Sequence, residues 1–172
     1  MKYQPWVWFE IKRRNGSQTT KRRFRLPKRD MPRVLQADRI SAEGLLDTER
    51  DTATAGLSEL AEYVQSLGEP LQANTLVNYR RLSWQNPDST LRVTLDLGLS
   101  FHQPPTDLWS REHALVRSAL GGGRSPFGAA ILEVKRLAPS PAWLDHALEE
   151  AELQPQSFSK FVAGAHAVHG PR

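Results

Sequence analysis

Residues 6–26, WVWFEIKRRNGSQTTKRRFRL, open the part of the sequence that decides the fold. Within Trp6–Arg14, the apolar Val7, Phe9 and Ile11 alternate with Trp8, Glu10, Lys12 and Arg14, which is the pattern of a β-strand. Asn15-Gly16-Ser17 is a turn sequence, and Thr19–Leu26 reads as a returning strand. The stretch therefore predicts an antiparallel β-hairpin.

The same kind of pattern returns later in the chain. Thr75–Trp84 and Leu91–Leu97 flank the turn Asn86-Pro87-Asp88-Ser89 and predict a second hairpin, and Ala129–Leu137 predicts a fifth strand. Helical spacing predicts helices at Ser58–Gln65, Trp143–Ala151 and Ser157–Ala165. The order of hairpin, helices, hairpin, strand and helices predicts an α+β fold, with an antiparallel sheet and helices packed against it.

Length and composition restrict the class of protein. The chain of 172 residues suits one domain, which we place at residues 1–165, with 166–172 as a flexible tail. The absence of cysteine excludes disulfides, thiolate zinc sites and a cysteine nucleophile. No apolar run approaches the roughly 20 residues of a membrane helix, and we expect a cytoplasmic protein.

The charge is unevenly distributed along the chain. Residues 1–39 carry 12 Lys and Arg against 3 Asp and Glu, whereas residues 40–172 carry 11 against 16. Such asymmetry favours an anionic partner at the N-terminal end. Nucleic acid, a membrane surface and a polyphosphate compound all fit, because charge alone does not choose among them.

The predicted strands each carry charged side chains on one face. These are Glu10, Lys12 and Arg14; Lys21, Arg23 and Arg25; Arg81; Arg92 and Asp96; and Glu133 and Lys135. If one sheet curls so that these faces point inward, they form a charged channel, and the apolar faces bury against the helices. Polyphosphate, with about one negative charge per phosphate, would neutralise the cations, and the carboxylates would hold a divalent metal. The alternative is the ordinary solvated face of an antiparallel sheet.

Several segments carry a family resemblance. In sequence order they are FEIKRR at 9–14, KRRFRL at 21–26, YRR at 79–81, LRVTLD at 91–96, ILEVK at 131–135, PAWL at 141–144 and FSKF at 158–161. Their order and spacing over nearly the whole chain resemble the VTC domain, the polyphosphate polymerase domain of the triphosphate tunnel metalloenzyme (CYTH-like) superfamily.

The resemblance implies an antiparallel β-tunnel that transfers the γ-phosphate of ATP onto a growing polyphosphate chain with Mn²⁺ or Mg²⁺. By position it implies phosphate binding by Lys12, Lys21, Arg81, Arg92 and Lys160, with Lys135 and Ser159 as further members. It implies metal binding by Glu133, with Glu10 as a second carboxylate. The expected partners are ATP and polyphosphate, with a membrane protein as an additional candidate and without nucleic acid, for which no recognised motif is present.

No segment of this sequence matches the N-terminal part of the family's domain. That part includes an opening basic strand and a strand with an Arg-x-Arg pair that grips the nucleotide phosphates. We therefore expect an N-terminally truncated domain with an incomplete barrel, unless an upstream start or a partner chain supplies the strands. One alternative function is a partial tunnel that binds polyphosphate or triphosphate without catalysis. For Ser159, the alternative role is to cap the last helix.

Overall fold

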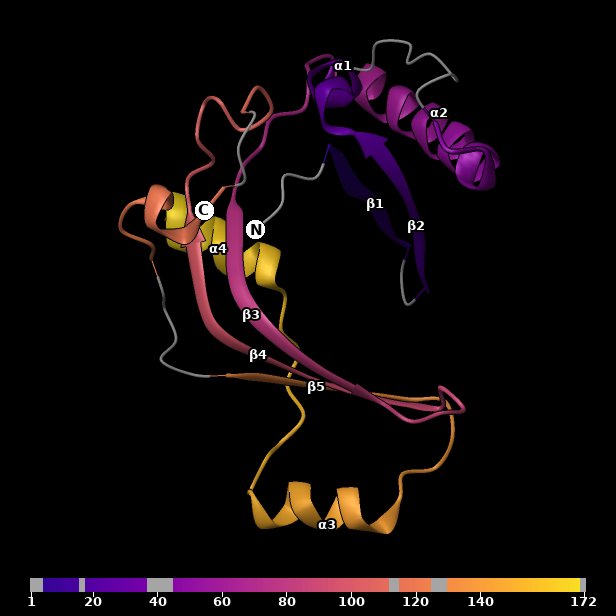
Figure 1. Ribbon diagram of the computed structural model, residues 1–172, viewed down its shortest axis with the longest axis vertical. Helices are drawn as coiled ribbons and strands as arrows, with labels where there is room; N and C mark the ends of the chain where they lie inside the picture. The colour runs from indigo at the N-terminus through magenta and orange to yellow at the C-terminus, as the bar shows by residue number, and fades with distance from the viewer. Residues whose placement is uncertain (1–4, 16–17, 37–44, 112–114, 125–129, 171–172) are drawn as a thin grey trace. The chain divides into compact units, whose positions relative to one another are not determined.

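The computed structural model describes residues 5–15, 18–36, 45–111, 115–124 and 130–170. The chain forms two compact units, each with its own hydrophobic core (Figure 1). The first unit comprises Met1–Ala73 and Pro105–Val116, and the second comprises Asn74–Pro104 and Arg117–Arg172. None of the helices in these described ranges is long and apolar enough to span a membrane.

The first unit is built on the predicted hairpin. Strands β1 (Trp6–Asn15) and β2 (Gln18–Pro27) pair antiparallel, with Phe9 opposite Phe24. The hairpin prediction is therefore confirmed, although Gly16 and Ser17 at its tip lie outside the described residues.

Helices cover the apolar face of this hairpin. Helix α1 (Met31–Leu35) follows β2, and α2 (Arg50–Leu67) is longer than the predicted Ser58–Gln65. Phe24 is fully buried under α2, where a Cβ on Gly56 would lie only 2.5 Å from its ring. A glycine inside this helix therefore allows α2 to approach the sheet closely.

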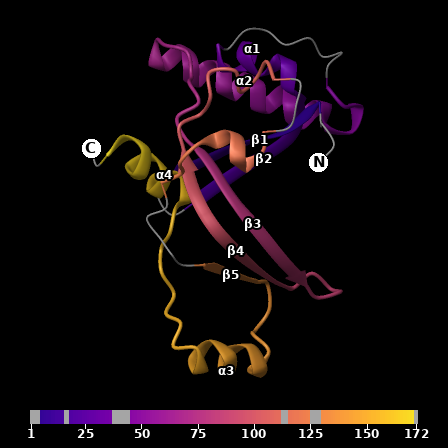
Figure 2. The same ribbon diagram turned by 60° about the vertical axis from the view of Figure 1, so that its left-hand side comes forward.

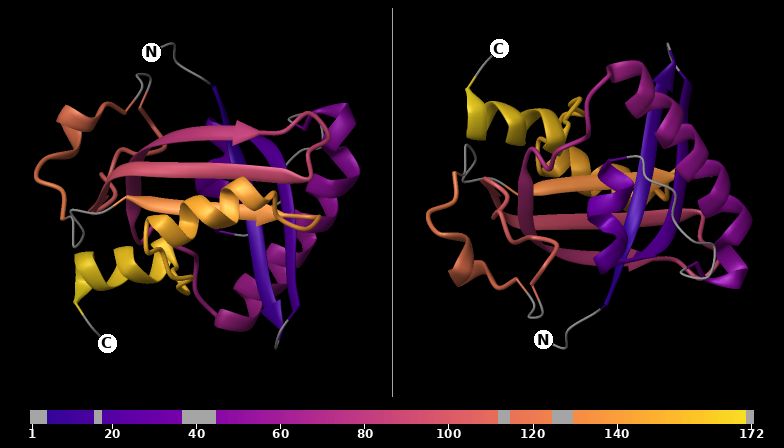
Figure 3. Two further views of the ribbon diagram at one scale, coloured as in Figure 1. Left: turned by 90° about the horizontal axis from the view of Figure 1, so that it is seen from below. Right: turned by 90° about the horizontal axis from the view of Figure 1, so that it is seen from above.

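The second unit contains an antiparallel sheet of β3 (Leu76–Gln85), β4 (Leu91–His102) and β5 (Ile131–Arg136), with β4 in the centre. Figure 3 shows these three strands side by side. Helices α3 (Ala142–Glu150) and α4 (Lys160–His169) lie on opposite sides of the sheet (Figures 1 and 2).

The core of the second unit lies between β4 and α4. Leu99 and Phe101 pack against Val168, and a Cβ on Gly164 would meet the Phe101 ring at 2.8 Å. Helix α4 extends beyond residue 166, where we expected a flexible tail, because its last turn contributes Val168 to this core.

A β-bulge in β4 determines which residues share a face. Asn78 pairs with Ser100 and Arg80 pairs with Leu97, so β4 has one residue more than β3 over this interval. Gly98 has a φ of +62°, a conformation that favours glycine at such a bulge. The bulge places Leu99 and Phe101 on the same face as Asp96, although simple alternation would separate them.

The prediction of an α+β fold with antiparallel sheets is confirmed. The described strands form one two-stranded and one three-stranded sheet, and no closed barrel is formed among them.

The prediction that the leucine-rich face of the second sheet would be its buried face is wrong. Leu82 and Leu132 on that face are 39% and 38% exposed, whereas Thr94 and Asp96 on the other face are 4% and 0% exposed.

Candidate phosphate-binding site

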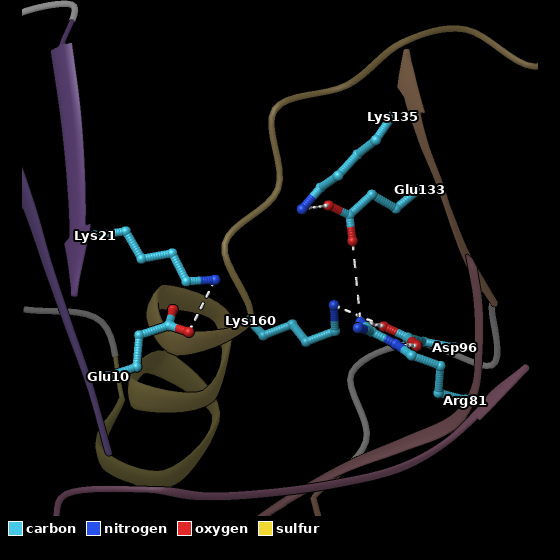
Figure 4. A network of polar contacts seen from close by, with 7 residues as sticks. All are labelled: Glu10, Lys21, Arg81, Asp96, Glu133, Lys135 and Lys160. Atoms are coloured by element: carbon cyan, nitrogen blue, oxygen red, sulfur yellow. Dashed lines mark hydrogen bonds and ion pairs between the residues drawn. The ribbon is translucent and has the colours of Figure 1, made fainter. Parts of the chain in front are cut away.

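The register of the second sheet brings charged side chains from all three strands to one face. Arg81 on β3 lies opposite Asp96 on β4, and Glu133 on β5 lies opposite Thr94, one step further along the same face. Lys160, the first residue of α4, reaches this face from the helix, and Lys135 reaches it from β5 (Figure 4). We call Arg81, Asp96, Glu133, Lys135 and Lys160 the charge cluster.

Asp96 is the centre of the charge cluster. Its carboxylate accepts hydrogen bonds from Arg81 Nε at 2.6 Å and Arg81 Nη2 at 2.8 Å, and Lys160 Nζ lies 2.8 Å from Oδ2. A buried carboxylate is costly unless it is paired and hydrogen-bonded, and this one has two cationic partners. The Tyr79 ring lies 5.3 Å from both Arg81 Cζ and Lys160 Nζ, within cation–π distance.

The contacts between Arg81 and Asp96 keep both groups ionised. The hydrogen bonds from Arg81 lower the pKa of Asp96 most; burial opposes them, and Lys160 adds to the lowering. The same hydrogen bonds raise the pKa of Arg81 above its ordinary value. Asp96 is therefore a carboxylate, not a carboxylic acid, over the neutral pH range.

Glu133 forms the second carboxylate of the charge cluster. Lys135 Nζ lies 3.1 Å from Oε1, and Arg81 Nη2 lies 3.9 Å from Oε2. Burial raises the pKa of Glu133, but the hydrogen bond and charge of Lys135, with the charges of Arg81 and Lys160, lower it further, so that it lies below its ordinary value.

One member of the charge cluster, Lys135, faces a like charge outside the cluster. Arg92 on β4 lies directly opposite Lys135 on β5, and both residues are exposed. Like charges at directly opposite positions destabilise a sheet. An anion bound across the two strands would remove this repulsion.

The hairpin of the first unit repeats this arrangement. Lys12 lies directly opposite Lys21, and Lys21 Nζ is 2.9 Å from Glu10 Oε2 (Figure 4). On the same face, the Arg23 guanidinium lies 4.4 Å from the centre of the Trp8 ring. This exposed face therefore carries several cations around one carboxylate, and the β4–β5 face likewise combines cations with carboxylates.

The structure places the predicted site residues in two groups. It brings Arg81, Glu133, Lys135 and Lys160 together and sets Arg92 beside them. Glu10, Lys12 and Lys21 form the second group, on the hairpin of the first unit.

Ser159 occupies the N-cap position of α4. Its Oγ accepts a hydrogen bond from the Val162 backbone N–H at 3.3 Å. The capping role, kept as the alternative for this residue, is therefore the one seen among the described contacts.

Alternation in the sequence places Thr94 and Asp96 on the charged face, but neither residue was predicted to belong to the site. The signal for Asp96 was a single acidic residue on a strand face shared with Arg92. Thr94 is 4% exposed and lies opposite Glu133, and its Oγ1 has no hydrogen-bond partner among the described residues. A buried hydroxyl without a partner is uncommon, because losing water without a replacement partner costs free energy.

The fit to a divalent metal is limited. Among the described residues, no group of three or more His, Asp or Glu side chains could hold a metal ion. Glu133 and Glu10 already have ammonium partners in Lys135 and Lys21. Mg²⁺ is commonly bound by one or two carboxylates together with substrate phosphates, and Glu133 fits that mode of binding better than an all-protein cage.

Comparison with known proteins identifies the family. No curated protein was found to be similar to the chain. A family model described as the VTC domain matches residues 1–169, nearly the full length. VTC domains are associated with polyphosphate polymerase function. The chain, with its two basic sheet faces, therefore belongs to the VTC domain family.

Proposed function

We propose that the chain is a polyphosphate polymerase-like domain that transfers the γ-phosphate of ATP onto a polyphosphate chain. The observation that carries the proposal is the face of the second sheet, where Arg81, Arg92, Lys135 and Lys160 surround only two carboxylates. An anion with several phosphates matches this excess of cations, because each phosphate contributes about one negative charge.

Phosphoryl transfer needs few protein groups beyond the cations on this face. Phosphoryl transfer depends mainly on positioning and on neutralising charge on the phosphate oxygens. Arg81 uses its Nε and one Nη2 hydrogen on Asp96, and a guanidinium has five N–H donors. The remaining donors of Arg81 and Lys160 can therefore bind phosphate oxygens while both side chains stay anchored.

The hairpin of the first unit is also proposed to bind phosphate. Lys12 and Lys21, which repel each other across β1 and β2, would bind phosphates of the same kind of ligand. We also propose that the protein forms the β-tunnel typical of the family.

We propose that Mn²⁺ or Mg²⁺ binds together with the phosphates. In the second unit Glu133 would hold it, and in the first unit Glu10 is the candidate carboxylate. When bound, such a metal neutralises charge on phosphate oxygens. Lys135 would then turn from Glu133 toward phosphate, since it would no longer be needed to neutralise that carboxylate.

A second candidate function is binding of polyphosphate or triphosphate without catalysis. The observation that favours it is that Asp96, Glu133 and Glu10 already have cationic partners, so no free acidic group stands ready for a metal among these site carboxylates. In this alternative the cations would bind the polyanion and no phosphoryl transfer would follow.

The test is to incubate the purified chain with ATP and Mn²⁺ and to stain the products for polyphosphate. Lys135→Gln and Arg136→Gln form a matched pair, because the two residues are neighbours on β5 and lie on opposite faces of the sheet. We expect Lys135→Gln to lose most polymer formation and Arg136→Gln to retain it. Equal losses would show a nonspecific charge effect and would refute the assigned site. No polymer, together with a rise in Tm on adding polyphosphate, would establish the binding alternative.

A further inference from the structure

Asp96 differs from the other carboxylates in the described part of the chain. It is fully buried, whereas the remaining acidic side chains there are at least partly exposed. It joins two elements that are distant in sequence, because its partners are Arg81 on β3 and Lys160 at the start of α4. No role for this residue follows from the binding of phosphate by cations alone.

The geometry around Asp96 has two consequences for a bound polyanion. The side-on contact through Nε and Nη2 fixes the plane of the Arg81 guanidinium, and Oδ2 fixes the Lys160 ammonium. The side chains of Arg81 and Lys160 remain 38% and 24% exposed, so both can be reached from solvent. The same carboxylate also adds a negative charge about 3 Å from the two nitrogens that would meet phosphate.

We propose that Asp96 is a positioning residue and a built-in counter-charge: it aligns Arg81 and Lys160 for phosphate transfer while weakening their hold on the polyphosphate product. This inference rests on the proposed function. A polymerase product is itself a polyanion that must advance by one phosphate after each transfer. Cations that bind the ground state too tightly would slow that advance, because only interactions stronger in the transition state raise kcat.

A purely structural role for Asp96 makes the opposite prediction for binding. If Asp96 only holds the fold together, replacing it loosens the site, and both phosphate affinity and turnover fall. If Asp96 is a counter-charge, replacing it with a neutral residue raises affinity through the unopposed cations and lowers turnover through lost alignment. The sign of the change in Kd therefore separates the two roles.

The test compares Asp96→Asn with Asp145→Asn. Both replacements remove one negative charge from the second unit, but Asp145 lies on α3, where its carboxylate is half exposed and pairs with Arg136 at 3.3 Å. Calorimetry at fixed salt gives the Kd for inorganic tripolyphosphate, and steady-state assays give kcat and KM for ATP. For Asp96→Asn we expect a Kd about three- to tenfold lower than that of the wild type, since one opposing charge is removed at short range. We expect kcat to fall at least tenfold, and both quantities to stay within twofold for Asp145→Asn.

Each outcome has a defined meaning. A higher or unchanged Kd for Asp96→Asn, with wild-type binding intact, overturns the counter-charge role and leaves the proposed function standing. An unchanged kcat overturns the positioning role. Absence of tripolyphosphate binding by the wild type overturns the proposed function and this inference with it.

A stability measurement covers the case in which Asp96→Asn is too unstable for calorimetry. Tripolyphosphate would then replace the missing negative charge between Arg81 and Lys160. We expect it to raise the Tm of Asp96→Asn by more than that of the wild type. A smaller rise would contradict the inference.

Discussion

Replacing Arg81 with methionine tests whether the charge cluster stabilises the second unit. The variant keeps an unbranched stem but removes both hydrogen bonds to Asp96, at 2.6 and 2.8 Å, and the contact with Glu133 at 3.9 Å. Removing one partner of a buried ion pair costs about 3–5 kcal/mol. Lys160 remains 2.8 Å from Asp96, and the Arg81 side chain is 38% exposed. We therefore expect the free energy of unfolding to fall by about 2–3 kcal/mol.

Urea unfolding followed by circular dichroism measures this change at pH 7. The double variant Arg81→Met with Asp96→Asn completes a double-mutant cycle. Because the second replacement removes the carboxylate that the first leaves underpaired, the two effects are expected to be non-additive by at least about 1 kcal/mol. A loss below about 0.5 kcal/mol for Arg81→Met, or strict additivity, would contradict the structural reasoning.

The pH dependence provides a second check on the same variant. The pKa of Asp96 is lowered in the folded state, so its pairing contributes stability that is fully present above the ordinary aspartate pKa of about 4. That contribution is lost as the pH falls through the lowered folded value. The difference between wild type and Arg81→Met is therefore expected to be constant near neutrality and to shrink in acid. A difference that does not change between pH 7 and pH 3 would show that Asp96 is not the group responsible.

Three further variants test other features. Thr94→Val removes a buried hydroxyl without a described partner and is expected to raise the free energy of unfolding by about 1 kcal/mol in chemical denaturation; a loss of stability would mean that the hydroxyl is hydrogen-bonded. Gly164→Ala places a Cβ 2.8 Å from the Phe101 ring and should destabilise the second unit by about 1–3 kcal/mol, measured as a lower urea midpoint, with no change counting against this packing. Glu133→Gln is expected to abolish Mn²⁺-dependent polymer formation while tripolyphosphate binding persists in calorimetry; unchanged synthesis would remove Glu133 from the proposed metal site.

Much of the secondary structure could be predicted because alternation along a strand is a local property. The hairpin of β1 and β2 follows from apolar side chains at every second position between turn residues. The same alternation correctly groups Glu133 with Lys135, and Arg92 with Asp96, on one face of their strands.

The burial of Asp96 could not be predicted, because it depends on contacts that are distant in sequence. Lys160 reaches Asp96 from a helix 64 residues further along the chain. The bulge at Gly98 also changes the phase of alternation within β4, so the apolar core and the charged side chains share a face there. A prediction from strict alternation assumes that the buried face stays the same along the whole strand. It therefore assigned burial to the leucine-rich face.

The extra residue at Gly98 divides β4 into two segments of opposite phase. Asp96 before the bulge and Leu99 and Phe101 after it therefore face the same side of the sheet. Helix α4 thus contacts this face of β4 twice, through Lys160 at Asp96 and through Val168 at Leu99 and Phe101. Among related chains, we expect Asp96 to be retained together with apolar residues at alternate positions after Gly98, because both sets of contacts hold the same helix.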